Sequence, residues 1–247
     1  MFNSSLKTIT NYSPNFDPIK RKLKDIKFII FHYTGMKNEM DATKRLTDIK
    51  SKVSSHYLIK NDGKIIILVP DAYIAWHAGR SSWKNYNSLN KVSIGIEISN
   101  TGHDFHYKKF SNRQINSILR LSKILINRYN IKSQNILGHS DIAPDRKKDP
   151  GEKFPWELLY KKKIGFYHDL NQKDLQKKRF LNTSNLEKEV FFKNLFKIGY
   201  PKKSKLKKHK YLKVLTKAFQ RRFRQKLING IIDQECLIIS DNLVQKT

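Results

Sequence analysis

Hydrophobic and polar positions along the first two thirds of the chain predict several β-strands. The apolar run over 27–32 is typical of a strand that is buried on both faces. In the run over 93–99, isoleucines alternate with other residues, so that Glu97 points away from the side that carries the isoleucines. The segments 54–59 and 64–69 predict a hairpin, because Asp62-Gly63 between them favours a tight turn.

Helices are predicted where apolar residues recur every three or four positions. The clearest case is 111–129, which begins with Ser111 and Gln114 at the spacing of a capping box. A shorter helix is predicted over 41–50, and another begins at Trp156. Together with the strands, these helices predict an α/β fold.

The pattern changes after about residue 165, where helical spacing continues in a strongly basic context. Gly199 ends one of these helices, and the Lys-rich segment 202–210 is interpreted as a charged linker. The predicted helices cover 186–198, the region around 212–223, and 232–243. We therefore expect a small C-terminal three-helix domain.

The length of 247 residues accommodates one larger domain and a smaller second one. We expect an N-terminal arm over 1–25, the α/β domain over 26–168, and the basic helical domain over 169–247. Hydrophobic residues make up 38% of the chain, which is low for a single core and predicts that part of it is thinly packed.

Charge points to an anionic partner. The chain has 50 Lys and Arg against 21 Asp and Glu, a formal charge of +29, and the excess is concentrated over 161–230. Nucleic acid, anionic lipid and an acidic cell-wall polymer all satisfy this requirement. Charge alone does not choose among them.

The terminus and the cysteine content bound the compartment. The first residues lack the apolar segment of a secretory signal, and no apolar run is long enough to cross a bilayer. Cys236 is the single cysteine, so no intrachain disulfide is possible. We expect a cytoplasmic monomer, with the periplasm or cell envelope as the alternative.

Candidate metal ligands gather around the segment 138–151. His139 and Asp149 offer a nitrogen and an oxygen of the kind that zinc accepts, and Pro144, Pro150 and Gly151 predict a non-helical path between them. A catalytic zinc site needs three protein ligands and an open fourth position. The best candidate for the third is His32, at the end of the first predicted strand.

Five ordered segments resemble the zinc N-acetylmuramoyl-L-alanine amidases of the type 2 amidase family, which is related to phage T7-type lysozyme and to peptidoglycan recognition proteins. The resemblance spans roughly 25–168. The segments after residue 198 resemble, more weakly, the peptidoglycan-binding-like domain of two-domain bacterial amidases of the AmiD type. The five segments are Phe31 to Thr34, Ser54 to Ile59, Ala75 to Gly79, Ser93 to Glu97 and Gly138 to Gly151.

The resemblance implies a fold, an activity and a set of roles. The fold is that of peptidoglycan recognition proteins and T7 lysozyme, a mixed central β-sheet flanked by helices with the site at one edge of the sheet. The reaction is hydrolysis of the amide between N-acetylmuramic acid and L-alanine in peptidoglycan turnover or recycling. His32, His139 and Asp149 are implied as ligands of one Zn²⁺ per chain, with Glu97 and Lys147 as the catalytic pair. Peptidoglycan or muropeptides are the implied partners.

The chemistry of these side chains fits amide hydrolysis. A zinc ion with an open position lowers the pKa of bound water to about 7. Glu97 can move the proton from that water to the leaving nitrogen, and the Lys147 ammonium can stabilise the oxyanion. Each also has an interpretation without function: Glu97 as an exposed strand residue, and Lys147 as part of a solvated basic loop.

Three further residues are candidates for substrate binding: Trp76, His77 and Arg80. Their segment, 75–90, has the aromatic and polar composition of a groove wall. A structural role is an equal alternative for His77, and Trp76 also suits a core position.

Two rival functions come from other classes. A non-catalytic peptidoglycan-recognition module shares the implied fold, although such proteins generally lack one of the zinc ligands, all of which are present here. A nucleic-acid-binding protein explains the positive charge, but no nucleic-acid motif accompanies it. An anionic envelope surface is the partner that we expect for the basic helices.

Overall fold

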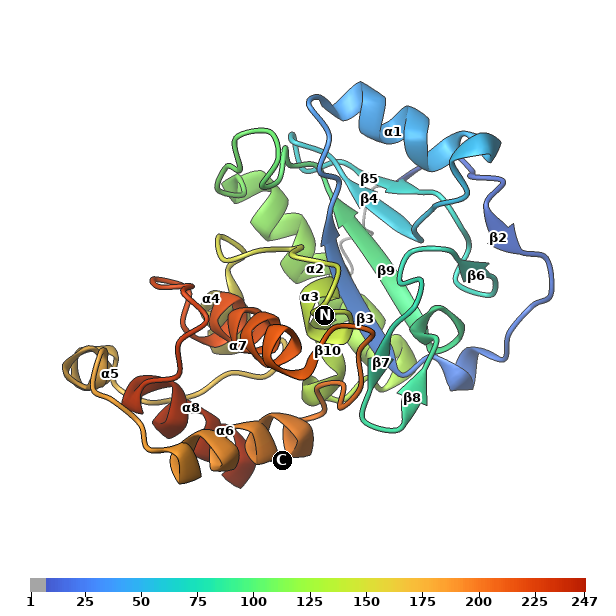
Figure 1. The fold of residues 1–247 in the computed structure, drawn as a ribbon. Coiled ribbons are helices and arrows are strands. Elements are labelled where there is room, and N and C mark those ends of the chain that lie inside the picture. The colour runs from blue at the N-terminus through green and yellow to red at the C-terminus, as the bar shows by residue number, and fades with distance from the viewer. Residues whose placement is uncertain (1–7) are drawn as a thin grey trace.

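The computed structural model describes residues 8–247, and its centre is a six-stranded mixed sheet flanked by helices (Figure 1). The strands lie in the order β1-β5-β4-β9-β3-β10; neighbours pair in parallel except β4 with β5. The expected fold class is therefore confirmed. The strands are β1 (Thr8–Thr10), β3 (Phe28–Tyr33), β4 (Tyr57–Ile59), β5 (Ile65–Ile67), β9 (Ser93–Ile98) and β10 (Ile136–Gly138).

Two small sheets accompany the central one. One pairs β2 (Phe16–Asp17) with β6 (Ile74–Ala75), and the other pairs β7 (Ser82–Trp83) with β8 (Tyr86–Asn87). The expected arm over 1–25 is in part outside the described residues, which begin at residue 8. From residue 8 on, the arm contributes β1 to the central sheet and β2 to one of the small sheets, so this part of the arm is built into the fold.

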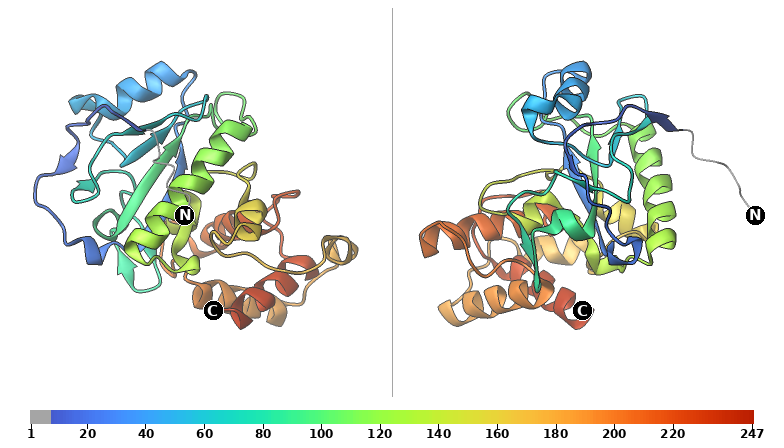
Figure 2. Two further views of the ribbon diagram at one scale, coloured as in Figure 1. Left: turned by 180° about the vertical axis from the view of Figure 1, so that it is seen from behind. Right: turned by 90° about the vertical axis from the view of Figure 1, so that its right-hand side faces the viewer.

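Helices cover both faces of the central sheet. The longest, α2, lies along one face, while the helices that follow residue 170 gather on the other side, near β10 (Figure 2). None of the helices within 8–247 is long and apolar enough to cross a membrane. The helices are α1 (Glu39–Thr47), α2 (Asn112–Tyr129), α3 (His139–Ile142), α4 (Trp156–Lys161), α5 (Gln172–Lys178), α6 (Asn185–Ile198), α7 (Lys208–Phe223) and α8 (Gln234–Gln245).

Local sequence signals account for several element ends. The predicted capping box of α2 is present, since the Ser111 hydroxyl accepts from the Gln114 backbone and the Gln114 side chain accepts from the Ser111 backbone. The predicted hairpin of β4 and β5 is also confirmed. Its turn contains Gly63, whose positive φ of 83° favours glycine.

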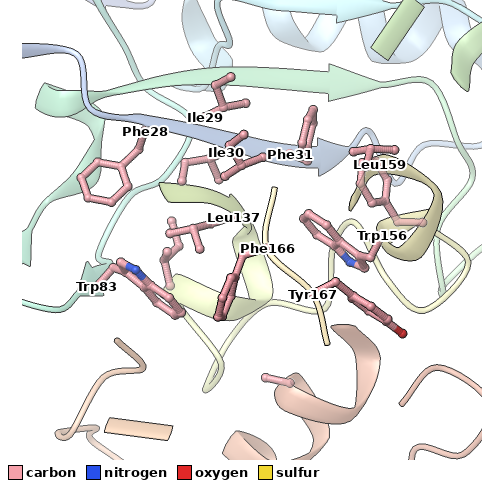
Figure 3. Packing of buried hydrophobic residues seen from close by; sticks show 14 of the residues in the cluster. Phe28, Ile29, Ile30, Phe31, Trp83, Leu137, Trp156, Leu159, Phe166 and Tyr167 are labelled. Atoms are coloured by element: carbon pink, nitrogen blue, oxygen red, sulfur yellow. The ribbon is translucent and has the colours of Figure 1, made fainter. Parts of the chain in front are cut away.

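The core begins at β3, between two parallel neighbours. Phe28, Ile29, Ile30 and Phe31 are fully buried, as expected for a strand covered on both faces. Figure 3 shows Trp156, Phe166 and Tyr167 in the layer between β3 and the C-terminal helices. The same hydrophobic cluster continues into α6, α7 and α8, so these helices share a core with the central sheet.

Three expectations about local structure were wrong. The segment 138–151 contains the short helix α3 (His139–Ile142). Pro144 disfavours the helical conformation at the residue before it, Ala143, and this leaves the four residues before Ala143 free to form one turn. The first helix begins at Glu39 rather than 41, because the Asn38 side chain caps it. The helix α5 was not predicted.

Candidate active site

The parallel strands bring the candidate residues together at their carboxyl ends. In the register of β3 and β9, His32 lies opposite Glu97. In the register of β3 and β10, Phe31 lies opposite Gly138, which places His139 beside His32. Open α/β sheets commonly bind their ligands at the carboxyl ends of the strands.

Asp149 reaches the same edge through a closed loop. The backbone N–H of Ser140 donates to the Asp149 carbonyl at 2.8 Å, so the chain returns to α3 after a short excursion. The Asp149 side chain is buried next to both histidines. The sequence-predicted ligands therefore meet in space even though more than a hundred residues separate the first from the other two.

Three ligand atoms converge at this point. His32 Nδ1 lies 2.9 Å from His139 Nδ1 and 3.0 Å from Asp149 Oδ2, and His139 Nδ1 lies 3.1 Å from the same oxygen. Tetrahedral zinc with bonds of about 2.05 Å places its ligand atoms about 3.3 Å apart. The spacing of the three atoms thus fits one small cation.

The protonation states of these residues also fit a metal. The other nitrogen of His139, Nε2, donates to the Ala78 carbonyl at 3.1 Å, so Nδ1 is the nitrogen that faces the other two ligand atoms. Burial, followed by the nearby His139, lowers the pKa of His32 to about 4. Burial alone would raise the pKa of Asp149, but the two imidazoles hold it well below its usual range. A neutral imidazole at His32 and an ionised carboxylate at Asp149 are forms that bind metals.

His77 is among the residues that line the cavity, and its ring also contacts His32 from behind. Its Nδ1 is 3.0 Å from His32 Nε2, and its Nε2 is 3.2 Å from the Ser93 hydroxyl. The ring is almost completely buried, with 8% of the residue exposed. This placement favours the structural role of His77, in which it orients the His32 ring.

The packing of His77 explains the glycine in β9. A Cβ atom on Gly95 would come within 2.4 Å of the His77 ring. We expect Gly95→Ala to lower the free energy of unfolding by about 3 kcal/mol, the upper range of overpacking costs. Urea unfolding of Gly95→Ala, His77→Ala and the double variant measures this. The two costs should be less than additive, because removing the ring removes the clash; full additivity would contradict the explanation.

Glu97 is a half-buried residue that lines the cavity, and its Oε2 atom is buried. Its Oε2 has no hydrogen-bond partner among the described residues, and burial followed by the charge of Asp149 raises the pKa of Glu97 to about 8. Lys147 acts in the opposite direction and lines the same cavity. An unpaired buried carboxylate is costly unless a ligand uses it.

The cavity above these residues has a volume of about 600 Å³. All five predicted metal and catalytic residues line it, and so does Trp76. The indole N–H of Trp76 donates to Asp17 at 2.7 Å. Arg80 is not among the lining residues. It pairs with Asp145 at 2.9 Å and lines a neighbouring cavity, which does not support the expected contact with substrate.

Sequence reasoning missed part of the cavity wall. Arg45 on α1, Asp104 and Arg146 line it without forming any recognisable spacing pattern. Arg146 also donates to the carbonyls of Ala78 and Arg80, so it anchors the segment after His77. The run Arg146 to Lys148 suggested a solvated basic loop, and nothing local to it indicates this anchor.

Comparisons with known proteins agree with this geometry. The family model for N-acetylmuramoyl-L-alanine amidase matches residues 22–152. The chain is 36% identical to the amidase AmiD of Escherichia coli over 234 residues, which cover 90% of this chain and 83% of that protein. It is 40% identical over 105 residues to the 1,6-anhydro-N-acetylmuramyl-L-alanine amidase AmpD of Citrobacter freundii, covering 42% of this chain and 54% of that one.

Solved structures extend the similarity to the whole fold. The structure of E. coli AmiD with anhydro-N-acetylmuramic acid-L-Ala-D-γ-Glu-L-Lys superposes with a TM-score of 0.78 at 33% identity, covering 90% of each chain. AmpDh3 of Pseudomonas aeruginosa also gives 0.78, at 30% identity over 100% of this chain and 97% of that one. The resemblance to the type 2 amidases noted in the sequence is thereby confirmed, and the chain belongs to the N-acetylmuramoyl-L-alanine amidase family.

Proposed function

We propose that this amidase uses one Zn²⁺, held by His32, His139 and Asp149, to cleave the bond between the lactyl group of N-acetylmuramic acid and L-alanine. The observation that carries the proposal is the convergence of three ligand atoms within 3.1 Å in the cavity that also contains the buried Oε2 of Glu97, which has no hydrogen-bond partner among the described residues. When bound there, zinc supplies an activated water and a Lewis acid for the amide carbonyl.

The side chains of the cavity perform the remaining steps. Glu97 accepts the proton that the attacking water gives up and delivers it to the nitrogen of L-alanine as the C–N bond breaks. The Lys147 ammonium stabilises the negative charge on the carbonyl oxygen, an interaction that is stronger in the tetrahedral state than in the substrate. His77 holds the His32 ring in place from behind.

Substrates of this site are muropeptides with L-alanine as the first stem residue. Supporting this, the AmiD and AmpDh3 structures are described with an anhydromuramic peptide bound. Arg45, Arg146 and Lys148 place positive charge along the cavity wall, which suits the carboxylates of a stem peptide.

Mass spectrometry of the released peptide tests the proposal. Zinc-loaded protein should release stem peptides with a free L-alanine amine from purified sacculi and from anhydro-muropeptides. Removal of the metal with a chelator should abolish release, and added zinc should restore it. Binding to sacculi without release would instead support the non-catalytic recognition module, and release that survives complete metal removal would contradict the role of zinc.

A further inference from the structure

The helix α3, which carries His139, is too short to fix its own orientation. It has only four residues, His139–Ile142, and a single turn has little intrinsic stability. Its placement therefore depends on contacts made by its side chains. Asp141, two residues after the metal ligand, makes the strongest of these contacts.

The Asp141 carboxylate is buried, and three donors surround it. One is local, since the backbone N–H of Gly138 donates to Oδ2 at 2.8 Å. The other two come from the C-terminal helical region. Arg222 Nη1 donates to Oδ2 at 2.5 Å, and the Tyr200 hydroxyl donates to Oδ1 at 2.9 Å.

Arg222 is itself held rigidly. Its side chain is 2% exposed, and its Nη2 donates to the carbonyls of Ile136 at 2.9 Å and Phe166 at 3.2 Å. Its guanidinium lies over the Trp156 ring, 4.4 Å from the centroid. Arg222 thus connects Asp141 on α3 with the start of β10, the strand that leads into His139.

The end of α7, the helix that carries Arg222, also contacts the segment after Asp149. Gln225, two residues past the end of α7, donates to the carbonyls of Glu152 at 2.6 Å and Phe154 at 2.7 Å. Helix α7 packs beside α3 (Figure 1). Both ligands from the 138–151 loop are therefore flanked by contacts from α7 and its end.

We propose that Arg222 and Tyr200 are positioning residues for the metal ligand His139, so that α7 is part of the metal centre rather than of a separable binding unit. The inference rests on the proposed metal site. It follows from the geometry because, among residues 8–247, Arg222 and Tyr200 are the only side chains that donate to Asp141 on the single turn of α3.

Arg224 provides a matched control. It lies on the same helix end, its side chain is 1% exposed, and it forms ion pairs with Asp233 and Glu235. Its remaining hydrogen bonds reach Leu227 and Asn229, and none reaches α3. Arg224→Met therefore removes an equally buried guanidinium without touching the metal site.

The test measures metal affinity in the full-length protein. Zinc affinity is determined by competition with a chromophoric chelator, and the Co²⁺-substituted protein is examined by visible absorption. We expect Arg222→Met to lower the zinc affinity about tenfold or more and to change the Co²⁺ spectrum. Tyr200→Phe, which keeps its volume, should cause a smaller loss, and Arg222→Lys should recover part of the affinity.

Arg224→Met should lower the melting temperature while keeping the wild-type zinc affinity and Co²⁺ spectrum. Wild-type affinity in folded Arg222→Met would overturn the inference, as would an equal loss in Arg224→Met. Should Arg222→Met fail to fold, Tyr200→Phe decides by the same criteria. If the zinc affinities of wild type and the variants follow this pattern but wild type cleaves no muropeptide, the positioning role stands and only the proposed function fails.

Discussion

Glu97→Gln is expected to lower kcat for muropeptide hydrolysis by about 10³-fold while leaving the zinc affinity unchanged. The amide keeps the shape of the side chain but cannot accept a proton from water, and general acid–base groups contribute about 10²–10⁴-fold. Glu97 lines the cavity beside the proposed ligands, and its Oε2 has no hydrogen-bond partner among the described residues, so it is free to take up this proton. The measurement is kcat and KM on a defined anhydro-muropeptide, with zinc content determined in parallel.

Glu157→Gln is the control for this experiment. Glu157 is exposed and pairs with Lys161 on α4, away from the cavity, so its variant should keep full activity. Retention of more than a tenth of kcat in Glu97→Gln would exclude Glu97 as the base. Loss of zinc together with activity would instead assign Glu97 a role in metal binding.

His139→Ala is expected to abolish both catalysis and the stabilisation of the protein by zinc. The variant removes one of the three proposed ligands and one of the two imidazoles that contact Asp149. Zinc at about 1,000 times its Kd should stabilise the wild type by about 4 kcal/mol. For a chain of this size that corresponds to about 10 °C in Tm. The variant should show no such shift in calorimetry.

His209→Ala serves as the matched histidine variant. His209 is exposed at the start of α7 and lies outside the cavity residues. Its variant should keep both the zinc-dependent Tm shift and the activity. A full zinc shift in His139→Ala would show that the ion binds elsewhere, which would contradict the proposed ligand set.

The sequence predicted the elements that carry strong local signals. Ser111 and Gln114 specified the start of α2, and Asp62-Gly63 specified the β4–β5 hairpin, because capping and turn geometry depend on neighbouring residues alone. The end of α6 at Gly199, with φ 137°, belongs to the same class. The short helices α3 and α5 were missed because one or two turns leave too little periodicity to detect.

For the site, the sequence by itself determined the chemistry: the donor types of His32, His139 and Asp149, and a carboxylate at Glu97 opposite an aliphatic face. Only the tertiary structure decided how these are held. His77 supports His32, Arg80 lies outside the cavity, and Arg222 reaches Asp141 across 81 positions. Such contacts depend on strand register and helix packing between distant segments, and no local pattern of residues encodes them.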